Sequence, residues 1–293
     1  YLDPDQNNQR VRQNILNAGI YAQLQTKLFT GFELMAGLRL DNATYFNKGN
    51  FSQLVYDELG LRTDNGLSTF QIQPRVQITW DFNDKHTDIL RIGGGIFASD
   101  INNYAMINNM VFDGTKVMSV DIKNTEEEPD IVPTPDFIGY RKDPSTAPGI
   151  DLLNNPKYAD KAVPTINMNS KDAKVPVVYK ANISYTHFFS DRLKMSVSGY
   201  MTLGRNNYMY IDRNMVDDPY FRLSAEGNRG IYVPASTIGK DGTLDWMEGR
   251  KSTKVGRVLE LVSEGKVNQF AFTVDGTWRY YKDGELSFSY TWN

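Results

Sequence analysis

The sequence has no cysteine, only two histidines and no long apolar run. The absence of Cys excludes disulfide frameworks and thiolate sites. His86 and His187 are too few for a histidine-rich metal site or a histidine-based catalytic triad. The 32 basic and 35 acidic residues nearly balance, which gives no general case for nucleic-acid binding. No run approaches the roughly 18 apolar residues that indicate a transmembrane helix, but strands of a membrane barrel would show only alternation.

Strict alternation appears in two runs near the start of the chain, from Ala18 to Leu28 and from Phe32 to Leu40. Apolar residues take one parity of each run and mostly polar residues take the other, as in strands with one apolar face. Thr30-Gly31 joins the runs, which predicts an antiparallel hairpin. Each arm is about twice the usual strand length and is long enough to cross a membrane at a tilt.

Six more alternating segments follow, so eight strands are expected in four hairpins. They cover residues 69–81, 88–97, 177–189, 193–203, 269–280 and 285–292. Short connections at 29–31, 81–87, 190–192 and 281–284 alternate with long ones at 42–67, 98–176 and 205–268. Outer-membrane barrels combine short periplasmic turns with long extracellular loops. The sequence therefore predicts an all-β protein in which residues 1–293 form part of one transmembrane antiparallel β-barrel domain.

This order of connections also predicts where the ends of the chain lie. If the short turns are periplasmic, the first strand descends from outside and the eighth returns there. Residues 1–14 are polar and show no signal peptide, so either the leader has been removed or the chain is an internal fragment. Complete bacterial barrels normally have periplasmic ends. We therefore expect an internal piece of a larger barrel.

Aromatic residues near the ends of the strands predict the two interfacial girdles of a membrane barrel. Those near the short turns are Phe29, Trp80, Phe82, Phe188, Phe189, Tyr280 and Tyr281, and those near the long loops are Tyr45, Phe46, Phe97, Tyr208, Tyr210 and Trp292. Pro74 lies inside an alternating run and predicts a bulge or altered pairing, because proline cannot donate to the ladder. Gly93-Gly94-Gly95 predicts close approach of another backbone or a bend.

Four short motifs carry a family resemblance, and their order matters more than any one of them. Tyr21-Ala22-Gln23 leading to Gly37-Leu38-Arg39-Leu40-Asp41 resembles a "YxQ … GLRYD" hairpin, with Leu40 where Tyr is usual. Pro74-Arg75-Val76 resembles a "PR" strand, residues 90–97 an "LRGGYGxF" strand, and Ser289-Tyr290-Thr291-Trp292 a "YTW" strand. Together they resemble TonB-dependent outer-membrane receptors, most nearly the Oar-like and SusC-like receptors of Bacteroidetes.

The resemblance implies a 22-stranded barrel in the bacterial outer membrane, of which this chain supplies about eight strands. It also implies a plug domain and a TonB box, neither of which is visible in the sequence. The implied function is TonB-dependent import of an oligosaccharide, peptide or chelate, or a related export role. The implied partners are membrane lipid, the TonB protein and a SusD-like surface lipoprotein or other outer-membrane subunits.

Charged residues on the polar parity are expected to face the lumen, since on the lipid face Arg or Lys costs about 2–4 kcal/mol at the midplane. The expected lumen-facing residues are Lys27, Glu33, Arg39, Asp41, Arg75, Arg91, Lys194, Asp275, Arg279 and Glu285. Most of them could simply solvate the lumen or pair with one another. The resemblance makes Arg39 and Arg75 candidate plug contacts.

Two stretches of the long connections, 100–120 and 206–232, mix Tyr, Phe, Met and Asn, a composition suited to recognition. Loops carry function more often than the scaffold does. The expected ligand-binding residues are Tyr104, Met106, Tyr208, Tyr210, Tyr220 and Tyr232.

Two other classes of protein remain open. A secreted β-sandwich adhesin or carbohydrate-binding module would show the same alternation, with its apolar parity inside. A hydrolytic barrel enzyme would need a nucleophile, base and acid that converge, and it ranks last. We therefore expect no enzymatic activity, no cofactor and no metal site.

Overall fold

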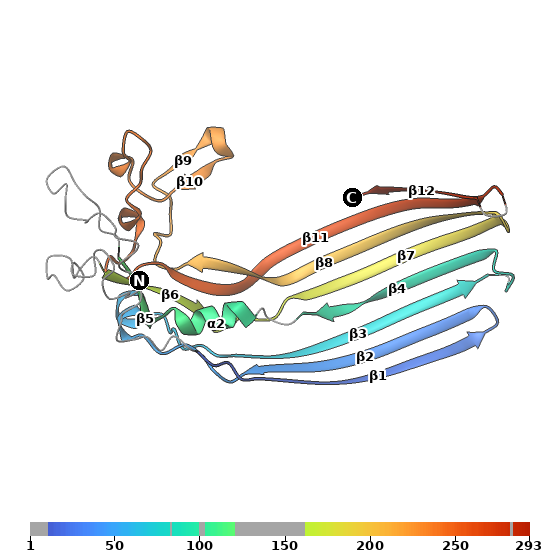
Figure 1. Ribbon diagram of the computed structural model, residues 1–293, viewed down its shortest axis with the longest axis horizontal. Helices are drawn as coiled ribbons and strands as arrows, with labels where there is room; N and C mark the ends of the chain where they lie inside the picture. Colours follow the sequence, from blue (N-terminus) through green and yellow to red (C-terminus); the bar gives the residue numbers. More distant parts are fainter. Residues whose placement is uncertain (1–10, 83, 100–102, 121–161, 282–283) are drawn as a thin grey trace, which may run out of the picture.

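The computed structural model describes residues 11–82, 84–99, 103–120, 162–281 and 284–293 (Figure 1). Twelve strands lie in this part of the chain, and ten of them form one sheet. Their order is β1-β2-β3-β4-β7-β8-β11-β6-β5, and β12 pairs with β11 beside this path. The sheet is open, and its short connections gather at one end while the helices lie at the other (Figure 1).

Four antiparallel hairpins make up the long strands, which confirms the predicted all-β architecture and its eight main strands. Their bounds are β1 Ile15–Phe29, β2 Phe32–Tyr45, β3 Leu67–Asp81, β4 Asp88–Ala98, β7 Val177–Ser190, β8 Leu193–Asp212, β11 Val258–Arg279 and β12 Glu285–Trp292. Gly31 has φ +79° in the first turn, a conformation that glycine adopts without a steric penalty. A Cβ at Gly31 would also lie 2.3 Å from the carbonyl oxygen of Asp81.

The strand register places the apolar parities of all eight long strands on one face. Leu24 pairs with Ala36, Ala36 with Val76, and Val76 with Gly94. Gly94 then pairs with Ala181 and Ala181 with Met201, and the series continues through Phe270 on β11. Because partners in a ladder share a face, the alternation in the sequence becomes one continuous apolar surface, called here the apolar face.

Of the two alternatives predicted at Pro74, the structure shows altered pairing and no bulge. β2 and β3 stay in register through the Leu38–Pro74 pair, whereas pairing of β3 with β4 ends at the next residue, Arg75. The missing N–H of proline accounts for the end of the ladder. The glycines permit the close approach that was predicted, since a Cβ at Gly95 would lie 2.9 Å from the carbonyl oxygen of Pro74.

The long connections contain more regular structure than expected. β8 continues to Asp212 and β11 begins at Val258, so part of the predicted 205–268 loop is strand. The remaining elements are α1 Gln53–Leu59, α2 Asn103–Val111, β5 Asp113–Val120, β6 Ala162–Asn169, β9 Phe221–Leu223, β10 Arg229–Ile231 and the 3-10 helices η4 Ser224–Glu226, η5 Ala235–Thr237 and η6 Trp246–Gly249. Residues 121–161 of the predicted 98–176 loop lie outside the described part.

Two apolar cores hold these connections together at the helix-bearing end of the sheet. We call the segments 46–66, 103–120, 162–176 and 213–257 the loop-end assembly. In one core, Met106 of α2 packs against Ala43, Tyr45, Leu67 and Val175. The other core consists of Val55, Ile166, Met168, Val255 and Val258. The second core includes β6, which runs parallel to β11 from the Val258–Ile166 pair to the Leu261–Asn169 pair. No helix among the described residues is long and apolar enough to cross a membrane.

Candidate functional site

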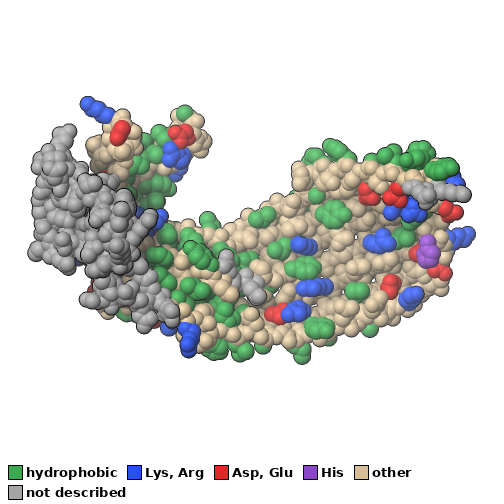
Figure 2. Space-filling model, viewed as in Figure 1, with side chains coloured by type: hydrophobic (Ala, Val, Ile, Leu, Met, Phe, Trp, Pro, Cys, Tyr) green, Lys and Arg blue, Asp and Glu red, His purple; other side chains and the backbone are tan. Residues whose placement is uncertain are grey.

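The face opposite the apolar face carries the predicted lumen residues and is called here the polar face. Figure 2 shows basic and acidic side chains spread over the face of the sheet in view. Arg39 donates two hydrogen bonds to Asp41, from Nε over 2.7 Å and from a terminal nitrogen over 2.8 Å. Gln73 Nε2 donates to the same carboxylate over 2.6 Å. These contacts join β2 to β3.

Arg75 continues this network toward β7. Its guanidinium donates to Gln73 Oε1 over 3.5 Å and lies 4.5 Å from the centre of the Phe97 ring. Lys180 Nζ lies 5.7 Å from the same ring. An aromatic ring attracts cations over its face, so Phe97 holds two basic side chains on the polar face. The structure thus brings Arg39, Asp41 and Arg75 together.

The other predicted lumen residues are distributed along the same face. Lys27 is the register partner of Glu33, which accepts a 2.8 Å hydrogen bond from Gln25. Arg279 donates to Glu285 over 3.1 Å. Arg91 pairs in register with Thr79, and Lys194 pairs with Thr277. Asp275 pairs with Ser196.

Between β7 and β12 the polar face is lined largely by hydroxyl groups. The hydroxyl oxygens of Thr186 and Ser196 lie 3.0 Å apart, and those of Ser184 and Ser198 lie 2.9 Å apart. Thr273 and Thr291 continue the pattern at 3.0 Å. These short side chains pair across strands, which satisfies their hydrogen bonding without a charge.

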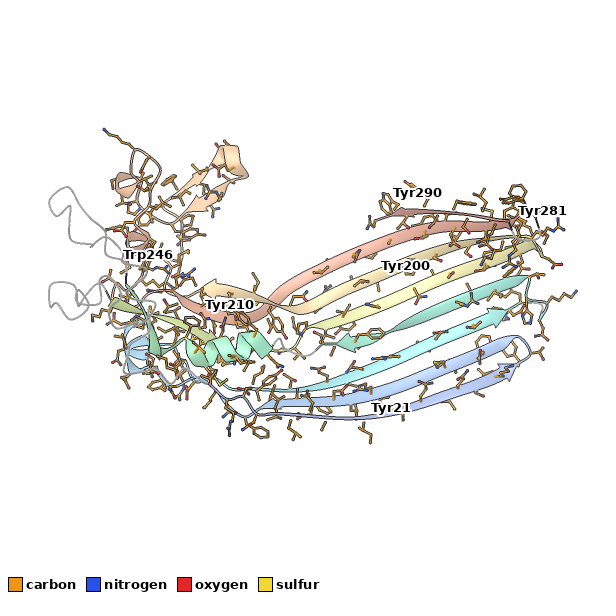
Figure 3. The ribbon with its side chains drawn as sticks, viewed as in Figure 1. Tyr21, Tyr200, Tyr210, Trp246, Tyr281 and Tyr290 are labelled. Atoms are coloured by element: carbon orange, nitrogen blue, oxygen red, sulfur yellow. The ribbon has the colours of Figure 1, made fainter. Side chains whose placement is uncertain are left out.

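Four of the six expected ligand-binding residues lie close together between α2 and β8, since Tyr208 packs against the core that contains Met106 and Tyr104 interacts electrostatically with Tyr210. Met106 is 1% exposed and packs in the apolar core, so its side chain is not available to a ligand. Tyr208 packs partly buried against the same core. Tyr104, Tyr210 and Tyr220 are exposed, with Tyr210 at the loop end of β8 (Figure 3), and Tyr232 is half-buried.

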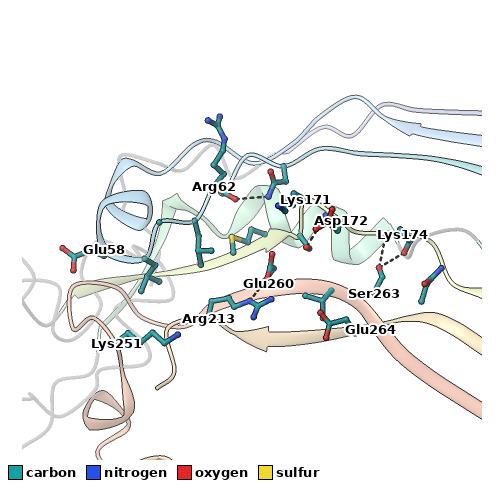
Figure 4. Close-up of a pocket in the computed structure, with 18 residues that line it drawn as sticks. Glu58, Arg62, Lys171, Asp172, Lys174, Arg213, Lys251, Glu260, Ser263 and Glu264 are labelled. Atoms are coloured by element: carbon teal, nitrogen blue, oxygen red, sulfur yellow. Dashed lines mark hydrogen bonds and ion pairs between the residues drawn. The ribbon is translucent and has the colours of Figure 1, made fainter. Parts of the chain in front are cut away.

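A cleft of about 930 Å³ in the loop-end assembly is lined by none of those six residues. Its walls come from residues 58–65 at the end of α1, residues 168–174 after β6, and the loop ends of β8 and β11 (Figure 4). Clefts of this size are typical of small-molecule and cofactor sites. The composition of the loops did not point to this cleft, because its lining contains no aromatic residue and comes from separate segments of the chain.

Ion pairs fix the rim of the cleft. Lys254 Nζ lies 2.6 Å from Glu58 Oε1, and the Ser252 hydroxyl donates to the other carboxylate oxygen over 2.8 Å. Together they lower the pKa of Glu58 below its ordinary value. Arg62 donates a bidentate pair of bonds to Asp64 over 2.9 and 2.8 Å, which lowers the pKa of that carboxyl group. Both carboxylates therefore stay ionised on the rim.

Near the loop-end assembly the outward side chains of the apolar face become polar, and apolar side chains are buried on the opposite face. On β2 the apolar parity ends at Leu40 and continues as Asn42 and Thr44. On the opposite face, Ala43 and Tyr45 are buried beneath α2. On β3, Thr69 is likewise buried beyond the exposed apolar run. The exposed apolar face is thus confined to the part of the sheet between the short turns and the loop-end assembly.

At the short-turn end, aromatic side chains form a row across neighbouring strands. Phe29 and Phe32 stack with ring centres 4.7 Å apart, and Phe32 lies 6.1 Å from Trp80. The row continues to Phe82, whose ring centre lies 4.6 Å from that of Trp80 and 6.2 Å from that of Tyr185. At the loop end the predicted girdle is wrong for Tyr45, Phe97 and Tyr208. Tyr45 is buried, the Phe97 ring lies under Arg75, and Tyr208 packs against the core that contains Tyr45.

Comparisons with known proteins give structural neighbours only. No protein-family model and no curated protein matches the sequence. The chain is similar to the FrpB iron transporter of Neisseria meningitidis (F3-3 variant), with 10% identity and a TM-score of 0.46 over 95% of this chain. It is also similar to the outer-membrane transporter YddB of Escherichia coli, with 11% identity and a TM-score of 0.48 over 94% of the chain. The match to the copper transporter OprC has 10% identity and a TM-score of 0.46 over 96% of the chain. The chain spans 26%, 24% and 29% of the lengths of these three proteins.

Proposed function

We propose that this chain forms part of the wall of a β-barrel transporter in the bacterial outer membrane. The observation that carries the proposal is the apolar face, which stays exposed across eight strands and is bounded at both ends. On β3 its exposed residues include Phe70, Ile72, Val76 and Trp80. Soluble monomers rarely leave a contiguous apolar patch larger than about a few hundred Å².

Both boundaries of the apolar face fit a bilayer. The apolar run extends from Phe70 to Trp80 on β3 and from Leu193 to Leu203 on β8, the length of the roughly 9–11 residues that cross a membrane at a tilt. The aromatic row lies at the short-turn boundary, where Trp and Tyr favour the lipid–water interface. Beyond Leu40 the outward side chains become polar, as expected in water.

The polar face supports a water-filled lumen rather than a second lipid contact. Several charged side chains along it are hydrogen-bonded to polar neighbours, and hydroxyl groups line much of the rest. The hydrogen-bonded residues are Glu33, Arg39, Asp41, Arg75, Arg279 and Glu285. The two open edges of the sheet would pair with further strands of the same barrel, because an open strand edge cannot face lipid.

A soluble β-sandwich has less support. Its second sheet would have to cover the apolar face, and the only other sheet in the described residues is the β9–β10 pair. That pair lies in the loop-end assembly, away from the apolar face (Figure 1).

The finer parts of the proposal rest on the sequence motifs. The hairpin around Tyr21 and Arg39 and the Pro74-Arg75-Val76 strand resemble TonB-dependent receptors of the Oar-like and SusC-like type. Energy coupling through TonB, a plug that contacts Arg39 and Arg75, and a SusD-like lipoprotein partner belong to this proposal.

Detergent dependence tests the proposed location. The natural full-length chain is expected in the outer-membrane fraction, and after extraction it should remain monodisperse only with detergent. A protein that folds and stays monodisperse without detergent would contradict the proposal.

A further inference from the structure

The cleft in the loop-end assembly has walls that are already fixed by contacts between its separate segments. Asn65 Nδ2 donates to the carbonyl oxygen of Asn169 over 2.9 Å, and Asn169 Nδ2 donates back to the carbonyl oxygen of Asn65 over 3.3 Å. The Ser263 hydroxyl accepts from Lys174 N and donates to Lys174 O, each over 2.8 Å. A site with fixed walls binds without the entropic cost of ordering them.

The base of the cleft is apolar and its interior ion pair is satisfied. Leu59 and Leu61 form this apolar base, since they are half-buried and pack against the core that contains Met168. Met168 and Val262 are themselves buried. Arg213 Nε donates to Glu260 Oε2 over 2.5 Å, which neutralises the buried carboxylate. This surface suits aliphatic groups of a ligand and has no unbalanced charge.

Unpaired charges of both signs surround this base. Among the described residues, Lys171 and Lys174 form no ion pair, and neither do Asp172 and Glu264. All four side chains are exposed at the cleft (Figure 4). Two ammonium groups and two carboxylates on one rim complement a ligand that carries both charges.

The lining disfavours two other classes of transported ligand. It contains no Tyr, Phe, Trp or His, so it offers no ring on which a sugar could stack. No group of three or more His, Asp or Glu side chains in the described residues could hold a metal ion. The carboxylates of the cleft therefore do not form a cation site.

From these contacts we infer that the cleft binds a short zwitterionic peptide with aliphatic side chains. Lys171 and Lys174 bind the peptide carboxylate, and Glu264 and Asp172 bind its ammonium group. Charge-assisted hydrogen bonds of this kind are stronger than neutral ones. The inference rests on the proposed transport function and specifies its substrate class.

Calorimetric titration of the detergent-solubilised full-length protein tests this inference with three probes. The probes are the tripeptide Ala-Leu-Ala, the same peptide with an acetylated amino end and an amidated carboxyl end, and maltotriose. We expect saturable binding of the free tripeptide, at least about tenfold weaker binding of the blocked peptide, and no binding of maltotriose. Equal affinity for the two peptides, tight binding of maltotriose, or no binding of the free tripeptide would overturn the inference.

A pair of variants locates the binding. Lys171→Ala combined with Lys174→Ala should weaken binding of the free tripeptide at least about tenfold and leave the affinity for the blocked peptide unchanged. Lys85→Ala combined with Lys240→Ala removes the same charge outside the cleft and should change the affinity for neither peptide. Equal losses in both double variants would overturn the assignment to this cleft. Outer-membrane fractionation of the same protein tests the proposed function separately, since a protein that inserts but does not bind peptide refutes only the substrate class.

Discussion

Gln23 and Leu24 are neighbours on β1 whose side chains point to opposite faces of the sheet. Leu24 pairs with Ala36 on the apolar face, while Gln23 pairs with Gly37 on the polar face. We predict that Leu24→Arg impairs barrel insertion much more than Gln23→Arg, because Arg on the lipid side costs about 2–4 kcal/mol near the bilayer midplane. The measurement is the fraction of folded protein recovered in the outer membrane. Similar losses for the two variants would refute the assigned faces.

Met106 and Ile107 provide a second matched pair on α2. Met106 is 1% exposed and Ile107 is 39% exposed. Met106→Ala should lower the stability of the loop-end assembly by about 2–5 kcal/mol, the usual cost of truncating a buried Met. Ile107→Ala should cost clearly less. Unfolding of the purified protein followed by limited proteolysis measures both, and equal costs would argue against the core that contains Met106.

The contact between α1 and the segment before β11 predicts a pH dependence. Hydrogen bonds from Lys254 and Ser252 hold the pKa of Glu58 below its ordinary 4.5, and Glu58 raises the pKa of Lys254 above its ordinary 10.5. The contact therefore contributes fully between about pH 4.5 and 10.5. Its contribution is lost as the pH falls through the folded pKa of Glu58 or rises through that of Lys254.

Glu58→Gln tests this dependence. The variant should have a slightly lower unfolding midpoint than the parent at pH 7, with a difference that disappears at low pH. The effect is small because exposed ion pairs contribute little. Asp84→Asn, at the opposite end of the sheet, is the control and should not change the dependence. A difference between Glu58→Gln and the parent that persists below the folded pKa would contradict the assigned cause.

Strand alternation was a good guide wherever one face of an element is apolar and the other polar. That condition holds for the eight long strands, and the sequence predicted all of them. It fails at the loop end of β11, where Val258, Leu261 and Val262 are buried on both faces. The alternation disappears there, so the extension of β11 could not be predicted.

The loop-end assembly shows the same limit for the candidate site. Its cleft depends on contacts such as Asn65 with Asn169, which are far apart in the chain. The Tyr, Phe, Met and Asn content of the loops pointed instead to Met106 and nearby tyrosines. Met106 is an apolar residue of the loop because it packs in a core, and not because it contacts a ligand. Composition alone does not distinguish a core residue in a long loop from a recognition residue.

For the whole molecule, the account requires one face of the sheet in lipid and the other in water. The two faces of β3 offer a direct comparison, because Phe70, Ile72, Val76, Ile78 and Trp80 share the apolar face while Gln71, Arg75, Gln77 and Thr79 share the polar face. Residues 1–293 contain no native Cys, so an introduced Cys is the only spin-label site in this part of the protein. Any Cys elsewhere in the full-length protein is replaced before labelling.

The most direct test is therefore a spin-label accessibility scan of residues 70–80 of the full-length protein in lipid vesicles. The account predicts that collisions with dissolved oxygen, which concentrates in lipid, peak at even-numbered positions apart from Pro74. Collisions with a water-soluble nickel complex should be higher at the exposed odd-numbered positions. Loss of this two-residue alternation, or high nickel accessibility on both faces, would contradict the central claim that this sheet is a membrane wall.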